Sequence, residues 1–390
     1  MTSRTLPERI LLGPGPSPIA PRVMRAMAAP VLSHLDPDLL PSLDDIRARL
    51  ARTFRAPDGS LALAISGTGT SGMEAAVANL IAPGMHVTAV VTGYFGDRLA
   101  QICERYGATV SRLDVEWGRA CDPDDLRRAL QRNRADLVAF VHAETSTGVL
   151  NPAEALAGVA REHGALTIVD AVTSLGGHPL EVEKWGITAA YSCSQKCIGA
   201  PSGMAPIVFS PEARARRVPS RSFYLDLDLL EDYWVRRKYH HTLSASLAYA
   251  LHEALTAVEE EGLDARWARH ERHHRALVAG LAAMGMEVLP PRGERLWTLN
   301  AVRVPEGVDE PHVRRQFLEK FNVEIGAGLG PLAGRIWRVG LMGAGSTPQL
   351  VLLVLWGLEV ALRGSRHRVP DGAGVAAAMR ELSDVTAAAG

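Results

Sequence analysis

The residue best suited to covalent chemistry is Lys196, within residues 192–197 (Ser-Cys-Ser-Gln-Lys-Cys). It is the single charged residue between positions 186 and 211, and an apolar run at 187–191 precedes it. A lysine in apolar surroundings loses hydration, which lowers its pKa and frees the neutral amine to attack an aldehyde and form a Schiff base. The alternative is a lysine at a loop tip whose ammonium group reaches into water.

A second candidate is Asp170, which ends an expected buried strand at residues 166–170. Open α/β sheets bind ligands beyond the C-terminal ends of their parallel strands, although an aspartate here could instead cap a loop. Lys196 follows the next apolar segment and is expected at the same sheet edge. A buried anion beside a reactive amine suits pyridoxal phosphate, with Asp170 keeping the pyridinium nitrogen protonated and Lys196 carrying the aldehyde.

A glycine-rich turn at residues 67–72 matches G-x-G-x-x-G between an expected strand and helix. The dinucleotide fingerprint also requires an acidic residue about 20 residues on, at the end of the next strand. That strand ends in Val91-Thr92-Gly93, so we do not expect NAD. Such a turn at a helix N-terminus still presents free backbone N–H groups to a phosphate, and the alternative is a tight turn without a ligand.

The segment with His270, Glu271 and His274 matches H-E-x-x-H, and Glu294 lies further along, which permits a zinc-protease interpretation. Zinc ligands need a buried cleft with supporting hydrogen bonds, and Glu294 follows two prolines in an expected loop. We expect no metal here, because the helix resembles a solvated face with an arginine at every third position: Arg266, Arg269, Arg272 and Arg275.

Arg338 stands in an apolar strand pattern at residues 336–342. A buried arginine is costly unless it meets an anion. A substrate carboxylate held in a bidentate fork would supply that anion, and a structural salt bridge with a nearby acid is the alternative.

The composition of the 390 residues narrows the class of protein. Hydrophobic residues make up 47%, which is enough for a large core, and the net charge of -1 gives no basic surplus for nucleic acid or an anionic membrane. No apolar run is long enough to cross a bilayer, and neither end carries a targeting signal. The four cysteines fit neither a disulfide framework nor a zinc site, so we expect a cytoplasmic enzyme.

Short apolar runs alternate with helical patterns over the first half of the chain, which is typical of a mostly parallel, doubly wound α/β sheet. Strands are expected at 61–65, 86–92, 109–113, 137–142 and 166–170, with helices at 73–80, 97–106, 122–131 and 152–163.

The pattern changes after residue 209. A loop-rich stretch at 211–241 precedes long helices at 243–260 and 265–284, strand-like pieces at 286–289, 296–304, 323–325 and 336–339, and helices at 310–320 and 348–362. We therefore expect an N-terminal arm (1–18), a large cofactor-binding domain (19–260) and a smaller α+β C-terminal domain (261–390).

Taken together, several motifs resemble the class V aminotransferases of pyridoxal phosphate fold type I, and most closely the alanine–glyoxylate and serine–pyruvate aminotransferases. The resemblance runs from about residue 11 to 362. The motifs are Gly13-Pro14-Gly15-Pro16, Ser66-Gly67-Thr68-Gly69, Glu144-Thr145-Ser146-Thr147-Gly148, Val169-Asp170-Ala171-Val172, Ser194-Gln195-Lys196, Tyr239-His240-His241-Thr242 and Arg338-Val339-Gly340.

The resemblance implies a role for each matching residue. Lys196 would form the Schiff base, Asp170 would pair with the pyridinium nitrogen and Arg338 would bind the substrate carboxylate. Phe95 would stack on the cofactor ring and Thr145 would contact its hydroxyl. The cofactor phosphate would be held by Gly69, Thr70 and Gln195, with Tyr239 and Thr242 reaching in from the partner subunit of a homodimer.

The resemblance also implies a ping-pong transfer of an amino group to glyoxylate or pyruvate. A related branch, the ureidoglycine–glyoxylate aminotransferases, carries Gln at the position of His34 and Asn near Phe223. Because Phe223 cannot hydrogen-bond a ureido group, we expect a small donor, L-alanine or L-serine, with His34 and Phe223 at the substrate. A lyase such as a cysteine desulfurase remains an alternative, although Cys193 and Cys197 flank the lysine and neither Cys103 nor Cys121 lies in an evident mobile loop.

Overall fold

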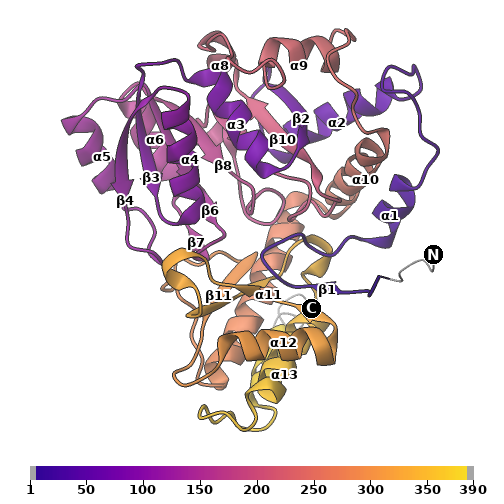
Figure 1. Cartoon of the computed structure of the whole chain (residues 1–390), viewed down its shortest axis with the longest axis vertical. Coiled ribbons are helices and arrows are strands. Elements are labelled where there is room, and N and C mark those ends of the chain that lie inside the picture. Colours follow the sequence, from indigo (N-terminus) through magenta and orange to yellow (C-terminus); the bar gives the residue numbers. More distant parts are fainter. Residues whose placement is uncertain (1–5, 384–390) are drawn as a thin grey trace.

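A seven-stranded sheet dominates the computed structural model of the chain, which describes residues 6–383 (Figure 1). The strand order is β2-β10-β9-β8-β5-β3-β4, and the neighbouring pairs are parallel except the two that β10 makes. The strands are β2 Leu61–Gly67, β3 His86–Val91, β4 Thr109–Asp114, β5 Leu137–Val141, β8 Leu166–Asp170, β9 Ala189–Tyr191 and β10 Gly203–Phe209. The expected α/β fold with a mostly parallel sheet is confirmed.

The central strands β5 and β8 are mostly apolar and are buried along their whole length, as in sheets that helices cover on both faces. The helix α3 (Gly69–Leu80) contacts α4 (Tyr94–Arg105), whereas α6 (Ala153–Glu162) contacts α5 (Pro123–Arg132) and α7 (Val182–Trp185). Asp122 caps α5 by accepting a hydrogen bond from the amide of Asp124 (2.9 Å).

Three further helices pack together beside β2 and β10: α1 Pro21–Met27, α2 Leu40–Thr53 and α10 Ala245–Glu261. The stretch predicted to be loop-rich contains two short helices, α8 (Pro211–Ala215) and α9 (Leu227–Trp234).

The C-terminal part, coloured orange and yellow in Figure 1, lies below this sheet. Its antiparallel sheet has the order β11-β14-β13, with β11 Leu299–Arg303, β13 Gly326–Ala327 and β14 Ile336–Gly340. The helices are α11 Leu263–Ala283, α12 Glu310–Phe321, α13 Pro348–Leu362 and α14 Ala373–Ser383, with 3₁₀ turns η1 Gly330–Leu332 and η2 Gly343–Gly345. A short antiparallel pair, β6 Ala143–Glu144 and β7 Val149–Leu150, stands between β5 and α6 in the sequence, and Val149 forms an isolated bridge with Arg295 of the C-terminal part.

The prediction of a strand at residues 286–289 is wrong. Only an isolated bridge forms there, between Val288 and Val302. Pro290 and Pro291 follow directly, and prolines have no amide with which to continue a ladder.

Two large apolar clusters form the core of the described residues. The first lies on the large sheet and extends to Leu255, and the second runs from Ala276 to Ala378. Leu12 belongs to the second cluster, and β1 (Ile10–Leu11) pairs in parallel with β12 (Val323–Glu324). The N-terminal arm is therefore an integral part of the C-terminal unit and not only a lead into the fold.

The domain limits remain a proposal, with the main division kept near residue 260. Residues 1–5 of the predicted arm and 384–390 of the predicted C-terminal domain lie outside the described residues. Within residues 6–383, no helix has the length and apolar character needed to cross a bilayer.

Candidate active site

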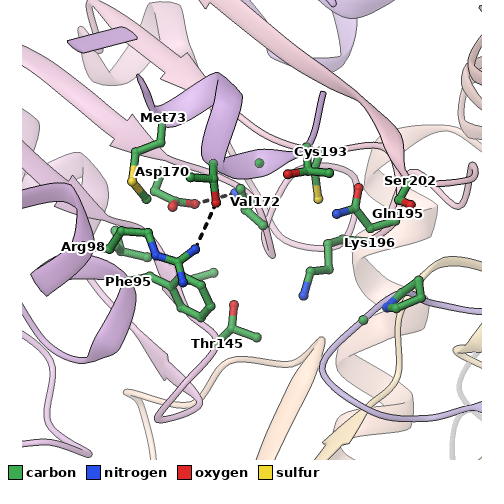
Figure 2. A pocket seen from close by; sticks show the side chains of 17 residues that line it. Met73, Phe95, Arg98, Thr145, Asp170, Val172, Cys193, Gln195, Lys196 and Ser202 are labelled. Atoms are coloured by element: carbon green, nitrogen blue, oxygen red, sulfur yellow. Dashed lines mark hydrogen bonds between the residues drawn. The ribbon is translucent and has the colours of Figure 1, made fainter. Parts of the chain in front are cut away.

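A cavity of about 340 Å³ opens where the ends of several strands of the large sheet meet, and side chains such as Phe95, Asp170 and Lys196 point into it (Figure 2). Asp170 ends β8, and Lys196 follows β9, so the parallel register brings both to one edge of the sheet, as predicted. Seven of the predicted site residues line this cavity: Gly69, Thr70, Phe95, Thr145, Asp170, Gln195 and Lys196.

The carboxylate of Asp170 is almost fully buried, with 3% exposed. It accepts hydrogen bonds from the amide of Val172 (2.8 Å) and from the hydroxyl of Tyr191 (2.9 Å). Burial raises its pKa to about 7, and the negative charge of Glu144 adds to this effect, while both hydrogen bonds and Lys196 oppose it. A cation bound at the open side of Asp170 would lower this pKa again and keep the side chain ionised. No pattern in the sequence indicates the contact with Tyr191.

The side chain of Lys196 is 9% exposed, and burial lowers the pKa of its amine. The alternative of a loop-tip lysine in water is wrong, because its ammonium group donates to the carbonyl of Pro14. Ser17 fixes the same loop, since its hydroxyl donates to the Lys196 carbonyl (2.7 Å) and its amide to the carbonyl of Gln195 (2.9 Å). The N-terminal arm thus forms a wall of the cavity, with Gly15 and Pro16 in its lining.

The N-terminus of α3 forms another wall of the cavity. Thr68 is its N-cap but makes no side-chain capping bond, so the first amides of the helix are left for another acceptor. A Cβ atom at Gly69 would stand 2.9 Å from a methyl group of Val172, which explains why glycine is needed there. The side-chain oxygen of Gln195 is buried without a partner in the described chain. These groups fit the phosphate of pyridoxal phosphate, with the Gln195 amide oriented by the ligand.

Phe95 and Thr145 both point into the cavity, and one buried carboxylate joins the segments that carry them (Figure 2). Glu144 accepts hydrogen bonds from the amide of Gly96 (3.1 Å), at the start of α4, and from the amide (3.0 Å) and hydroxyl (2.6 Å) of Ser146. Sequence reasoning assigned Glu144 no role, since a single acidic residue in a polar loop carries no signal of burial.

Arg338 lies in β14 with 7% of its surface exposed, beside the cavity and not among its lining residues. Its Nε donates to the carbonyl of Ala327 (2.6 Å) and one Nη to that of Thr145 (3.4 Å). Within residues 6–383 it forms no ion pair, so the alternative of a structural salt bridge is wrong. Burial lowers its pKa to about 10, although the negative charges of Glu144 and Glu324 act in the opposite direction and raise the pKa. An unpaired guanidinium of this kind is suited to binding a carboxylate.

Four predicted site residues do not reach the cavity of their own chain. Tyr239 and Phe223 are exposed by 65% and 75%, Thr242 is also exposed, and His34 packs against Tyr239 with ring centres 5.3 Å apart. Together with neighbouring rings, His34, Phe223 and Tyr239 form an aromatic surface that also contains Tyr224 and His240 and is backed by the buried rings of Tyr233 and His241. This surface reaches the end of β2, where His241 Nε2 lies 3.0 Å from Ser66 Oγ.

The expectation of a solvated face on the His270 helix is wrong for one side of α11. Arg266, His270 and His274 are all buried, and burial lowers the pKa of both histidines. His270 bonds the Arg266 carbonyl (2.7 Å) and the Gly343 amide (3.1 Å), and His274 lies 2.7 Å from the side-chain oxygen of Asn300. Across the described residues, no group of three or more His, Cys, Asp or Glu side chains is placed to hold a metal ion.

The four cysteines are free and buried. Burial raises the thiol pKa to about 12 for Cys103, Cys121 and Cys193 and to about 11 for Cys197. Since the thiolate is the nucleophile, this burial disfavours the desulfurase alternative, even though Cys193 lines the cavity.

Fold and site together define an enzyme that uses pyridoxal phosphate. The family model "Aminotransferase class-V" matches residues 11–333. The chain is similar to an (S)-ureidoglycine–glyoxylate transaminase of Bacillus subtilis, at 38% identity over 96% of this chain and 95% of the relative. The crystal structure of a ureidoglycine–glyoxylate aminotransferase from Bacillus subtilis superposes with a TM-score of 0.94, at 39% identity over 97% of this chain and 99% of that one. The crystal structure of an alanine–glyoxylate aminotransferase from Nostoc superposes with a TM-score of 0.91, at 42% identity over 93% of this chain and 97% of that one.

The chain therefore belongs to the class V aminotransferases. It is a transaminase, and its cofactor is pyridoxal phosphate.

Proposed function

We propose that this transaminase moves the amino group of L-alanine or L-serine to glyoxylate, with pyruvate as a weaker acceptor, by a ping-pong mechanism. The observation that carries the proposal is the buried pair Lys196 and Asp170 in one small cavity next to Arg338. The similarity to both ureidoglycine–glyoxylate and alanine–glyoxylate aminotransferases supports glyoxylate as the acceptor.

The bound cofactor supplies an aldehyde that takes up the amino group and a ring that accepts electrons from the α-carbon. Lys196 holds the aldehyde at rest and then, as a neutral amine, moves the proton at the α-carbon, a task that its lowered pKa favours. Asp170 keeps the ring nitrogen protonated from its buried position. Arg338 binds and orients the substrate carboxylate.

The size of the cavity supports a small donor. About 340 Å³ lies near the lower end of the roughly 300–1,000 Å³ typical of ligand sites, and this space must hold both cofactor and substrate. His34 and Phe223 can discriminate between donors only from a partner subunit, because neither lines the cavity of its own chain. These two residues thus leave room for another donor. Ureidoglycine is the second candidate, because the chain is similar to the Bacillus subtilis enzyme.

A panel of single-turnover reactions tests the donor. The cofactor-loaded enzyme is mixed with L-alanine, L-serine, L-aspartate or ureidoglycine, and the loss of the visible cofactor band is followed in time. We expect alanine and serine to react fastest. A faster reaction with ureidoglycine or aspartate would replace the proposed donor.

We also propose an obligate homodimer with active sites built from both subunits. Three ring nitrogens on the aromatic surface are buried without a partner in the described chain, namely His34 Nε2, His240 Nδ1 and His241 Nδ1. Buried polar atoms are normally hydrogen-bonded, so a second subunit or the cofactor phosphate would satisfy them.

Subunit mixing tests the dimer. Inactive Lys196→Ala is combined with a Tyr239→Phe/Thr242→Ala double variant, and heterodimers with one intact site are expected to regain part of the activity. A fully active monomer in sedimentation would overturn this arrangement. We further propose a cytoplasmic location, supported by the four unpaired cysteines.

A further inference from the structure

Arg98 is a charged residue of the cavity wall to which the sequence assigned no role. It lies on α4, and its Nη1 donates to the hydroxyl of Thr70 at the start of α3 (2.9 Å). Its guanidinium carbon lies 5.0 Å from the ring centre of Phe95 and 5.2 Å from that of Tyr94. Figure 2 shows the guanidinium beside the Phe95 ring, at the end of the cavity away from Lys196.

The charges of the cavity are unbalanced at this end. Among the seventeen lining residues the charged side chains are Arg98, Asp170 and Lys196, and Arg98 has no carboxylate partner in the part of the chain that the structure describes. A cation stacked on two rings and facing a cavity keeps only part of its hydration. It is therefore placed to meet an anion.

The phosphate ligands expected from the sequence are all uncharged: Gly69, Thr70, Gln195 and, from the partner subunit, Tyr239 and Thr242. A phosphate ester carries close to two negative charges at neutral pH, and enclosing it with neutral donors alone is costly. Lys196 is committed to the aldehyde and is not free to pair with the phosphate. Arg98 can supply the missing charge, because one of its five N–H donors reaches Thr70 and others remain free.

We propose that Arg98 is the cation of the phosphate subsite and binds the cofactor's phosphate dianion directly. The Thr70 hydroxyl and the Phe95 ring hold the guanidinium in place before the ligand arrives, so little side-chain freedom is lost on binding. The inference rests on the cofactor and not on the choice of amino donor. The competing interpretation is that Arg98 only packs α4 against α3.

Binding to the cofactor-free protein separates these two interpretations. Wild type, Arg98→Gln and Arg98→Lys are titrated with pyridoxal phosphate and with pyridoxal, which lacks the phosphate, and binding is followed by quenching of tryptophan fluorescence. We expect Arg98→Gln to weaken pyridoxal phosphate binding by about 10- to 100-fold and pyridoxal binding by less than about 3-fold. Arg98→Lys keeps the charge without the planar fork, so its affinity for pyridoxal phosphate is expected to lie between those of wild type and Arg98→Gln.

Inorganic phosphate supplies an independent measurement, since it should compete with pyridoxal phosphate in wild type and less effectively in Arg98→Gln. Arg105→Gln is the matched control, because Arg105 lies on the same helix, is exposed and does not line the cavity. Equal losses for both ligands, or no loss in either Arg98 variant, would overturn the proposal. Failure of the amino-donor panel with intact cofactor affinity would instead contradict the proposed function alone.

Discussion

Asp170→Asn in the cofactor-free protein isolates the electrostatic cost of the buried carboxylate. The two side chains have nearly the same shape, and both hydrogen bonds can be kept. The amide oxygen can accept from the Val172 amide, and the amide nitrogen can donate to the oxygen of Tyr191. The substitution therefore removes the charge and leaves the contacts in place.

The expected size of the effect follows from the pKa of Asp170. The unfolded chain releases the proton near pH 3.8, whereas the folded chain retains it until about pH 7. Between these values the folded state binds more protons, so the free energy of unfolding decreases as the pH rises. At about 1.4 kcal/mol per pKa unit, the loss approaches roughly 4 kcal/mol above pH 7 and vanishes below about pH 4.

Urea unfolding of the cofactor-free wild type and variant, at intervals from pH 4 to pH 8, measures this difference. We expect Asp170→Asn to become progressively more stable than wild type, by about 2–4 kcal/mol at pH 8. The buried histidines contribute equally to both proteins and cancel in the comparison. Adding pyridoxal phosphate should reverse the order, since only the carboxylate attracts the protonated ring nitrogen. A stability difference that stays constant from pH 4 to pH 8 would refute the reasoning.

Three further substitutions test other parts of the site. Lys196→Ala should lose the covalent link to the cofactor and nearly all turnover. A variant that still transaminates and keeps a yellow colour that borohydride bleaches would show that another residue forms the Schiff base. Glu144→Gln keeps one oxygen for the Ser146 amide but turns an N–H donor toward the Gly96 amide at the start of α4, so it should lower the free energy of unfolding by about 2–3 kcal/mol in urea. An unchanged midpoint would mean that this carboxylate does not join the two segments. Arg266→Met removes hydrogen bonds to the carbonyls of Gly176 and Cys197 and leaves Glu261 with one arginine fewer. We expect the free energy of unfolding to fall by about 3 kcal/mol, and a fall below about 1 kcal/mol would mean that these contacts of Arg266 contribute little to stability.

The parts of the site that the sequence predicted are those that follow from the order of the strands. Asp170 directly ends an apolar run, and Lys196 follows the next one, so a parallel sheet brings them to one edge whatever the details of packing. The turn before α3 was recognisable for the same reason, because glycines between a strand and a helix mark a tight connection.

The parts that could not be predicted depend on packing between segments far apart in the sequence. Arg98 stands on a helix with a strong polar face, where an arginine normally lies in water, and only the contact between α3 and α4 directs it to the cavity. His270 and Arg266 were misplaced because nothing in the helix pattern shows that one side of α11 faces the junction of the two units. Tyr239 and Phe223 remain predictions, since a single chain leaves them on its surface.

The N-terminal arm gives the clearest case of long-range dependence. Leu12 is buried in the C-terminal core, and five residues later Ser17 bonds the carbonyl of Lys196. A segment this short transmits displacement, because its ends are fixed to two different units. The position of Lys196 therefore depends on the packing of the C-terminal unit as well as on the sheet that carries it. A shift of that unit relative to the sheet would move the arm, and with it the wall of the cavity that faces the reacting amine.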